Sequence, residues 1–265
     1  FSFIFGNEIW ALRLPSAMAG VFSVWLMFRL VGCLARDEYA GLLAALILAL
    51  NSMHVWISRA VLMESLLVMF LLALFNAWLV FLENKNRWIG LGLMLGLAAL
   101  TKYTFIFLPA TFALYAAIFR RDLFCRRETY LALILALAVF LPVIVYNIFL
   151  YGSRGHFDLQ WSYLFGQATP EWTASFGKLQ EPFSAWWVNM TGMYSIVFML
   201  AAAGALIYTI IRFYLKREAM LLIYPLMLIS VTLVLVGIGS AERFISLYLV
   251  PAVPAAAVFA IAVFK

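Results

Sequence analysis

Long apolar stretches recur along the whole chain and constrain its fold more than any other feature. A helix needs about 20 mostly apolar residues to cross the hydrocarbon core of a bilayer, whereas a barrel strand needs only about 10. Only 11% of the 265 residues are charged, against roughly 25% in a soluble domain. Because backbone polar groups in lipid must be satisfied within the protein, the sequence predicts an all-α, polytopic bundle of transmembrane helices. The apolar stretches lie at 14–34, 39–57, 61–82, 129–150, 191–214, 219–237 and 244–264.

One further stretch, 88–119, is too long for a single span. As one helix it would extend ~48 Å at ~1.5 Å per residue, well beyond a core ~30 Å thick. A break at Thr101-Lys102-Tyr103-Thr104 gives about nine spans, and every strongly basic loop then falls on one side. By the positive-inside rule that side is cytoplasmic, and residues 1–13 lie outside. The basic residues on the predicted inner side are Arg29, Arg36, Lys85, Arg87, Arg120, Arg121, Arg126, Arg127, Arg212, Lys216, Arg217 and Lys265.

The remaining unusual polar residues gather on the predicted outer side. They are Glu8, Arg13, His54, Arg59, Glu64, Lys102, Tyr103, Glu242 and Arg243. The cations Arg59, Lys102 and Arg243 suit an anionic phosphate or pyrophosphate, which arginine binds bidentately and lysine as a point charge. Glu64 is compatible with three roles: general base, metal ligand or ion-pair partner of Arg59. The structural alternatives are a snorkelling Lys102 and an Arg243 that anchors a helix end.

The charge distribution also bears on partners and redox state. The net charge of +6 comes from the predicted inner loops, which orient a membrane protein and contact anionic headgroups, so nucleic acid is not an expected partner. Cys33 and Cys125 map to the inner side, which argues against a disulfide. The long segment 151–190 is rich in aromatic residues. We expect it at the outer interface, either as an aromatic belt or as a lid over a lipid or acceptor groove.

Several motifs follow one another in an order that resembles a known family. They are Phe5-Gly-Asn-Glu-Ile-Trp-Ala-Leu-Arg-Leu-Pro-Ser-Ala17, Ala40-Gly-Leu-Leu-Ala-Ala-Leu46 with Asn51, Ser58, Arg59 and Glu64, Gly92-Leu-Met-Leu-Gly-Leu-Ala-Ala-Leu-Thr-Lys102, and Glu242-Arg243-Phe244 with Tyr248, Pro251 and Pro254. Their order resembles that of the GT-C glycosyltransferases, and the branch of protein O-mannosyltransferases and lipid A aminoarabinose transferases is the most similar. The resemblance covers most of the chain.

The resemblance implies an integral enzyme of the plasma or inner membrane. Such an enzyme moves a sugar from a polyprenyl-phosphate carrier to a protein or lipid acceptor on the extracytoplasmic face. In that family a carboxylate acts as base on the acceptor, basic residues bind the lipid phosphate, and some members use a divalent metal. Carried over by position, Arg59, Lys102, Tyr103 and Arg243 would bind the lipid phosphate or substrate. Glu64 would be an active-site carboxylate, with His54 as a further candidate.

One departure from the family pattern leaves alternatives open. The first outer loop of the family, with its acidic motif, precedes the segment with which this chain begins. We therefore expect one transmembrane domain over 1–265, with 1–13 juxtamembrane and 151–190 interfacial, whose N-terminal part is missing. If the chain is instead a shortened relative, it would be a non-catalytic scaffold or accessory subunit of a larger membrane complex. A transporter would need charges near mid-membrane or paired inverted repeats, and the sequence shows neither.

Overall fold

The computed structural model describes residues 8–158, 161, 162, 165–167, 183–216, 219–238 and 242–264, and its regular elements in these ranges are all helices. The all-α prediction is therefore confirmed. The helices are α2 (Ile9–Ala35), α3 (Glu38–Leu50), α4 (Ser52–Arg59), α5 (Met63–Glu83), α6 (Trp88–Thr101), α7 (Phe107–Phe119), α8 (Arg127–Arg154), α11 (Trp186–Met193), α12 (Ile196–Lys216), α13 (Ile223–Ile238), α14 (Glu242–Ile245) and α15 (Leu249–Phe264). Short 3₁₀ helices join them: η1 (Lys85–Arg87), η2 (Tyr103–Ile106), η3 (Arg121–Cys125), η6 (Phe183–Ala185), η7 (Ala219–Leu222) and η8 (Ser246–Tyr248).

The prediction of about nine spans agrees only approximately with the number of long apolar helices in the structure. In the described part of the chain, six helical segments are long and apolar enough to cross a membrane, and α3 with α4 forms a seventh that is bent by 60°. The stretch 88–119 is broken where the sequence predicted: α6 ends at Thr101, and Lys102 is extended at φ −168° and ψ 137°. Each piece is shorter than a full span. Together they form a helical pair that brings Lys102 back to the end where α5 starts.

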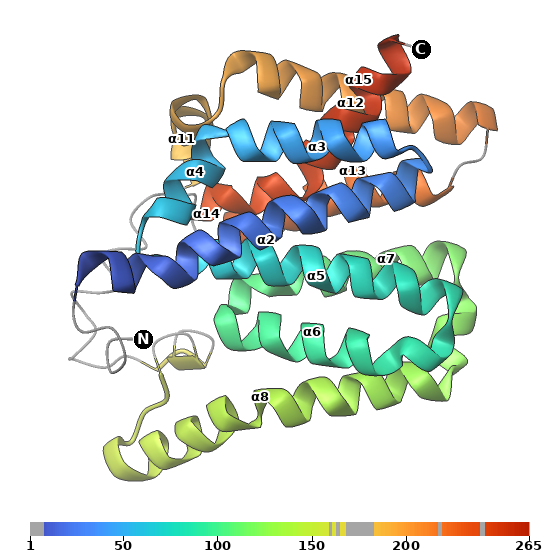
Figure 1. The fold of residues 1–265 in the computed structure, drawn as a ribbon. Coiled ribbons are helices and arrows are strands. Elements are labelled where there is room, and N and C mark those ends of the chain that lie inside the picture. Colours follow the sequence, from blue (N-terminus) through green and yellow to red (C-terminus); the bar gives the residue numbers. More distant parts are fainter. Residues whose placement is uncertain are drawn as a thin grey trace.

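Successive helices run back and forth, so the bundle has two distinct ends (Figure 1). We call the end with α4, the start of α5 and residue 102 the Lys102 end. The other, which we call the basic end, carries η1 and η3 with Lys85, Arg87, Arg120, Arg121, Arg126 and Arg127. These six basic residues, which the sequence predicted on one side of the membrane, thus lie at the same end of the bundle.

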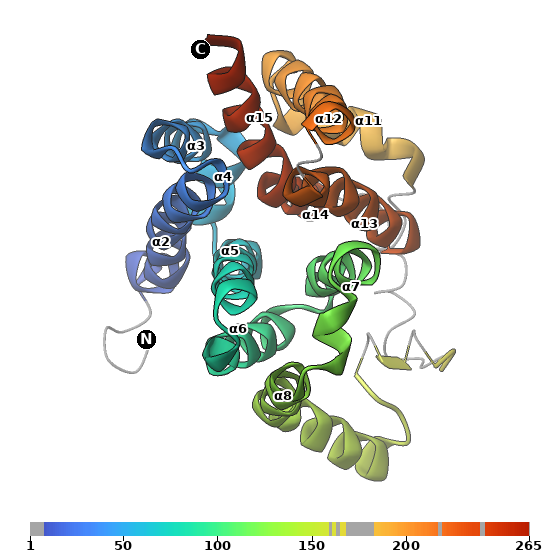
Figure 2. The ribbon, with the colours of Figure 1, turned by 90° about the vertical axis from the view of Figure 1, so that its right-hand side faces the viewer.

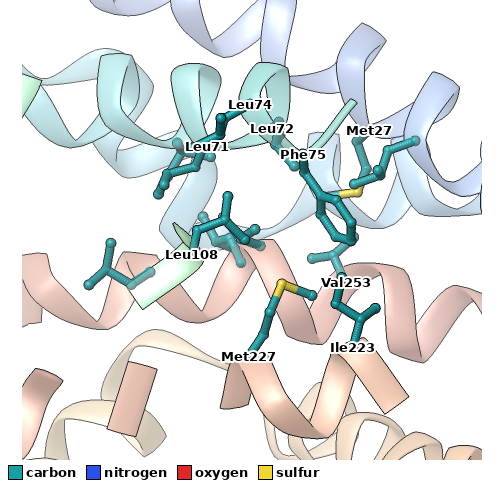
Figure 3. Close-up of a cluster of buried hydrophobic side chains, with 14 of the residues drawn as sticks. Met27, Leu71, Leu72, Leu74, Phe75, Leu108, Ile223, Met227 and Val253 are labelled. Atoms are coloured by element: carbon teal, nitrogen blue, oxygen red, sulfur yellow. The ribbon is translucent and has the colours of Figure 1, made fainter. Parts of the chain in front are cut away.

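Helix α5 lies at the centre of the bundle (Figure 2), packed between α2 and α6. On one side α2 packs on α3, and on the other α6 packs on α8. The second half of the chain closes the bundle, because α7 packs on α13 and α15 packs on α3 and α12. Figure 3 shows the buried core where these helices meet, and its labelled side chains are Met27, Leu71, Leu72, Leu74, Phe75, Leu108, Ile223, Met227 and Val253.

The contact between α6 and α8 depends on small residues. Gly92 and Gly96 are one helical turn apart and face Ala132 and Ala136 of α8. A Cβ atom at Gly96 would lie 2.6 Å from Cβ of Val139, so only glycine permits this approach. Small residues at four-residue spacing let helix backbones approach closely in membranes, where burial of apolar side chains alone does not drive association. The contact holds α8 against α6, the helix that ends at the break before Lys102.

Several predicted boundaries shift in the structure. The first span, expected at 14–34, begins at Ile9, so Ile9–Arg13 of the predicted juxtamembrane segment belong to α2. Helix α8 continues to Arg154 and ends at Gly155, which adopts φ +75° and donates its N–H to the carbonyl of Tyr151 at 2.8 Å. Glycine tolerates this left-handed conformation, which terminates many helices. The span expected at 191–214 begins only at Ile196 because Met193 ends the separate helix α11. The middle of the predicted interfacial segment 151–190, residues 168–182, lies outside the described residues, as do 159, 160, 163 and 164.

Candidate functional site

The connection from α3 to α5 positions the residues at the Lys102 end. Asn51 ends α3 and caps α4, and its side chain accepts hydrogen bonds from the N–H groups of Met53 at 3.0 Å and His54 at 3.3 Å. Asparagine suits a helix N-cap because its oxygen satisfies donors that lack a partner within the helix. The chain therefore bends by 60° after α3, and α4 packs against α2 at Gly20. Ser52 fixes α4 to the distant helix α11, because its hydroxyl donates to the carbonyl of Met193 at 2.8 Å.

Two serines fasten the start of α5 to α2. The hydroxyl of Ser65 donates to the carbonyl of Ser16 at 2.7 Å, and the hydroxyl of Ser16 donates to the carbonyl of Leu62 at 3.3 Å. Both serines are buried. Glu64 lies between these two attachment points in the first turn of α5, where the helix dipole favours a negative charge. The carboxylate is thereby fixed in place.

The central feature of the site is an ion pair between Glu64 and Lys102. The lysine Nζ lies 2.6 Å from Oε1 of Glu64, and the side chains are 22% and 5% exposed, respectively. The same Nζ lies 4.4 Å from the centre of the Phe244 ring, a distance at which a cation is attracted to an aromatic face. Residues from α5, the α6–η2 break and α14 therefore meet at one ammonium group.

The Arg59–Glu64 pair considered from sequence does not form. The backbone is extended at Ala60, directly after the end of α4, and this leaves Arg59 exposed while Glu64 turns inward. The carboxylate of Glu64 forms its ion pair with Lys102 instead. Arg59 makes no hydrogen bond or ion pair with another described residue. Its guanidinium is therefore available at the surface of the Lys102 end.

Tyr103 joins the site to α8 through a second carboxylate. Its hydroxyl donates to Oδ2 of Asp158 at 3.0 Å, and the side-chain N–H of Asn147 donates to the same oxygen at 3.0 Å. The other carboxylate oxygen accepts the N–H of Trp161 at 2.9 Å. In return, the N–H of Asp158 donates to the amide oxygen of Asn147 at 2.8 Å. The carboxylate is thus bound by three donors and links η2, α8 and the segment after α8.

Sequence reasoning missed Asn147 and Asp158. Asn147 is fully buried in the otherwise apolar α8. The side-chain amide of Asn147 within a long apolar run could have indicated a site, since polar residues in such runs usually have a hydrogen-bonded partner. Asp158 had a weaker signal, because nothing in the sequence ties it to Tyr103.

The other wall of the site is formed by α14 and η8. The hydroxyl of Tyr248 accepts a hydrogen bond from Nε1 of Trp186 at 3.0 Å and lies 2.9 Å from the hydroxyl of Thr232. These bonds hold η8 between α11 and α13, and they place Phe244 beside Lys102. Arg243, predicted to bind phosphate, precedes Phe244 in α14. The position of its side chain lies outside the described part of the structure.

His54 lies on the other side of α4, against α2. It is buried at 5% exposure, and a Cβ atom built on Gly20 would lie 3.9 Å from its ring carbon Cε1. Neither its Nε2 nor the hydroxyl of Ser58, one helical turn later, has a hydrogen-bond partner within the described residues. No ion pair or hydrogen bond links His54 to Glu64 or Lys102. The structure therefore separates His54 from the other predicted site residues.

Metal ligands are not grouped in the described part of the chain. No three side chains of His, Cys, Asp or Glu there lie close enough together to hold a metal ion. Two described carboxylates at the site already have protein partners, Glu64 in an ion pair and Asp158 in three hydrogen bonds. These residues by themselves do not form a metal site.

Comparison with known families gives one match. A family model described as dolichyl-phosphate-mannose-protein mannosyltransferase matches residues 1–146, which is more than half of the chain. The matched range includes Arg59, Glu64, Lys102 and Tyr103 and ends within α8. No curated protein and no solved structure is significantly similar to the chain.

Proposed function

Because the chain belongs to the dolichyl-phosphate-mannose-protein mannosyltransferase family, we propose that it transfers a sugar from a polyprenyl-phosphate carrier to an acceptor. The acceptor is a protein or a lipid on the extracytoplasmic face of the membrane, where the sequence-based topology puts the Lys102 end. The observation that carries the proposal is the partly buried ammonium of Lys102, held between Glu64 and Phe244.

Lys102 suits the phosphate of the lipid carrier. A lysine ammonium binds phosphate as a point charge, and the contact with Glu64 at 2.6 Å holds this one in place. A charge that is 22% exposed is less screened by salt than a fully exposed one, so it attracts a phosphate more strongly. We assign the lipid phosphate to this ammonium. Arg59, exposed at the end of α4, and Arg243, in α14, are assigned as the further cations around it.

Glu64 has two consecutive roles in this proposal. In the free protein it fixes the ammonium of Lys102. When a phosphate draws the ammonium away, the carboxylate is released and accepts the proton of an acceptor hydroxyl. The hydroxyl oxygen then bonds to the anomeric carbon of the sugar, the bond from that carbon to the phosphate oxygen breaks, and polyprenyl phosphate leaves. Tyr103 and Asp158 hold the α6–η2 break in position during these steps.

The test uses the purified chain in lipid nanodiscs with polyprenyl-phosphate mannose as the donor probe. We expect Lys102→Ala to reduce transfer by ~10–150-fold, since a hydrogen bond to a charged group contributes ~1.5–3 kcal/mol. Lys85→Ala is the matched control, because it removes the same charge from an exposed position at the basic end. Unchanged transfer in Lys102→Ala, Arg59→Ala and Arg243→Ala would refute the site assignment.

A binding measurement separates the enzyme from the non-catalytic alternative. A ligand that binds only the folded protein raises its melting temperature as its concentration rises above Kd. We expect polyprenyl phosphate to stabilise the wild type and the Lys85→Ala variant, but not Lys102→Ala. Stabilisation of a wild-type chain that transfers no sugar would instead support a scaffold that binds the lipid carrier.

A further inference from the structure

A separate site, which is apolar, opens near the basic end, away from the Glu64–Lys102 pair. It is a crevice of about 190 Å³ between α7 and α8, with α5 and α6 behind it. Its rim includes Phe124, Tyr130 and Leu133, which are 45%, 54% and 50% exposed. The crevice therefore opens to the outer surface of the bundle. An apolar cavity of ~150 Å³ in another protein binds benzene, so this crevice is large enough for a segment of one hydrocarbon chain.

The walls of the crevice run along the helix axes. On α7 the lining extends from Pro109 to Ala116, a distance of ~10 Å at ~1.5 Å per residue. At the basic end, two side chains of α8 hold η3 across the crevice: the Thr129 hydroxyl donates to the carbonyl of Leu123 and the Tyr130 hydroxyl to that of Phe124, both at 2.8 Å. The crevice is thus a narrow slot that runs from the basic loop toward the middle of the bundle.

Four arginines flank the loop at the mouth of this slot. Arg120 and Arg126 both bond to Asp122, at 3.0 Å and 2.5 Å, so their charges are partly balanced. Arg121 and Arg127 are exposed, and neither forms an ion pair with another described residue. Arg121 uses only its Nε, which donates to the carbonyl of Ala117 at 2.9 Å. The loop that lines the basic end of the apolar slot through Leu123 and Phe124 therefore carries two exposed arginines that can bind an anion.

We propose that this crevice binds one acyl chain of an anionic glycerophospholipid, with the lipid phosphate at Arg121 and Arg127. The apolar walls match a hydrocarbon chain, and the excess of positive charge selects a negatively charged headgroup. The acidic residue in the first turn of α8, Glu128, is paired with Lys85 at 3.5 Å, so it leaves the excess of positive charge on this loop in place. A slot that holds one chain segment favours a linear acyl chain over a branched polyprenyl chain. The lipid belongs to the leaflet at the basic end, opposite to the proposed sugar-transfer site.

The test is native mass spectrometry of the full chain, titrated with phosphatidylglycerol or phosphatidylcholine of identical acyl composition. We expect tighter binding of phosphatidylglycerol. Each basic residue near a membrane surface contributes about 1 kcal/mol to binding of anionic lipid, so the double variant Arg121→Gln/Arg127→Gln should bind it about 30-fold more weakly. Arg36→Gln is the matched control, because it removes an exposed charge from the connection between α2 and α3, outside α7, η3 and α8.

A second pair of variants tests the crevice itself. Ala113→Trp fills it from an exposed position on α7 and should abolish binding of the acyl chain, whereas Ala110→Trp is exposed on the same helix but outside the lining. Unchanged binding in Ala113→Trp would overturn the crevice assignment. Equal affinity for the two phospholipids, or displacement of phosphatidylglycerol by equimolar polyprenyl phosphate, would overturn the proposed occupant. Both measurements are independent of sugar transfer.

Discussion

The Glu64–Lys102 pair allows a prediction in which the two partners are not equivalent. Removing one member of a buried pair costs ~3–5 kcal/mol because the other charge is left uncompensated. The carboxylate is 5% exposed, whereas the ammonium is 22% exposed and also faces Phe244. Lys102→Met leaves the more buried charge, the carboxylate of Glu64, without its partner and should lower the free energy of unfolding by ~3 kcal/mol, at the low end of that range. Glu64→Gln leaves the more exposed charge, the ammonium of Lys102, without its partner and should lower the free energy of unfolding by less, ~2 kcal/mol.

Thermal unfolding of the detergent-solubilised protein measures this difference through tryptophan fluorescence. At ~2–4 °C per kcal/mol for a chain of this size, we expect the melting temperature to fall by ~6–12 °C in Lys102→Met and ~4–8 °C in Glu64→Gln. The double variant should lose less than the sum, because it leaves no unpaired charge.

Lys85→Met supplies the control for this cycle. It breaks an ion pair with Glu128 that is 3.5 Å long and 60% exposed on the lysine side, and such pairs contribute ~0–1 kcal/mol. A loss in Lys102→Met no larger than in Lys85→Met would refute the reasoning. Full additivity in the double variant would refute it as well, since it would mean that the two charges do not interact.

Three further predictions concern packing, the second carboxylate and topology. Gly96→Ala should destabilise the protein by ~1–3 kcal/mol because its new Cβ collides with Val139. Gly90→Ala, with open space around it, should be neutral or stabilising in the same thermal unfolding measurement. Tyr103→Phe should lower stability by ~1 kcal/mol through loss of the bond to Asp158, and Tyr130→Phe, which loses an exposed bond, should lower it less. A membrane-impermeant thiol reagent should label the exposed Cys125 only from the cytoplasmic side and a cysteine placed at Arg59 only from the other side; labelling of both from one side would contradict the topology.

Much of the fold follows from patterns within single segments of the sequence. The apolar stretches predicted helices, and the limited thickness of a bilayer predicted the break at Lys102, because one helix over 88–119 is too long. The break was placed correctly since the polar residues lie there. Boundaries were less accurate where a helix end depends on tertiary contacts, as at Ser195, where α12 starts only after the α11 turn.

The partners of the charged residues could not be predicted in the same way. Arg59 is the nearest cation to Glu64 along the chain, yet the ion pair forms with Lys102, 38 residues away. Sequence distance fails here because the chain between the two residues is not one helix: the backbone is extended at Ala60 and α5 begins at Met63, so Glu64 turns inward and Arg59 stays exposed. Asp158 is a similar case, since its contact with Tyr103 depends on the packing of α8 against α6.

The extended backbone at Lys102 explains why two adjacent residues serve two different helices. In an extended segment, successive side chains point to opposite sides, whereas in a helix they lie about 100° apart. Lys102 therefore reaches Glu64 at the start of α5, and Tyr103 reaches Asp158 beside α8. A continuous helix through residues 101–104 would bring these side chains closer in direction and could not satisfy both carboxylates. The break that lets the chain fit a bilayer is thus also the feature that assembles the candidate site.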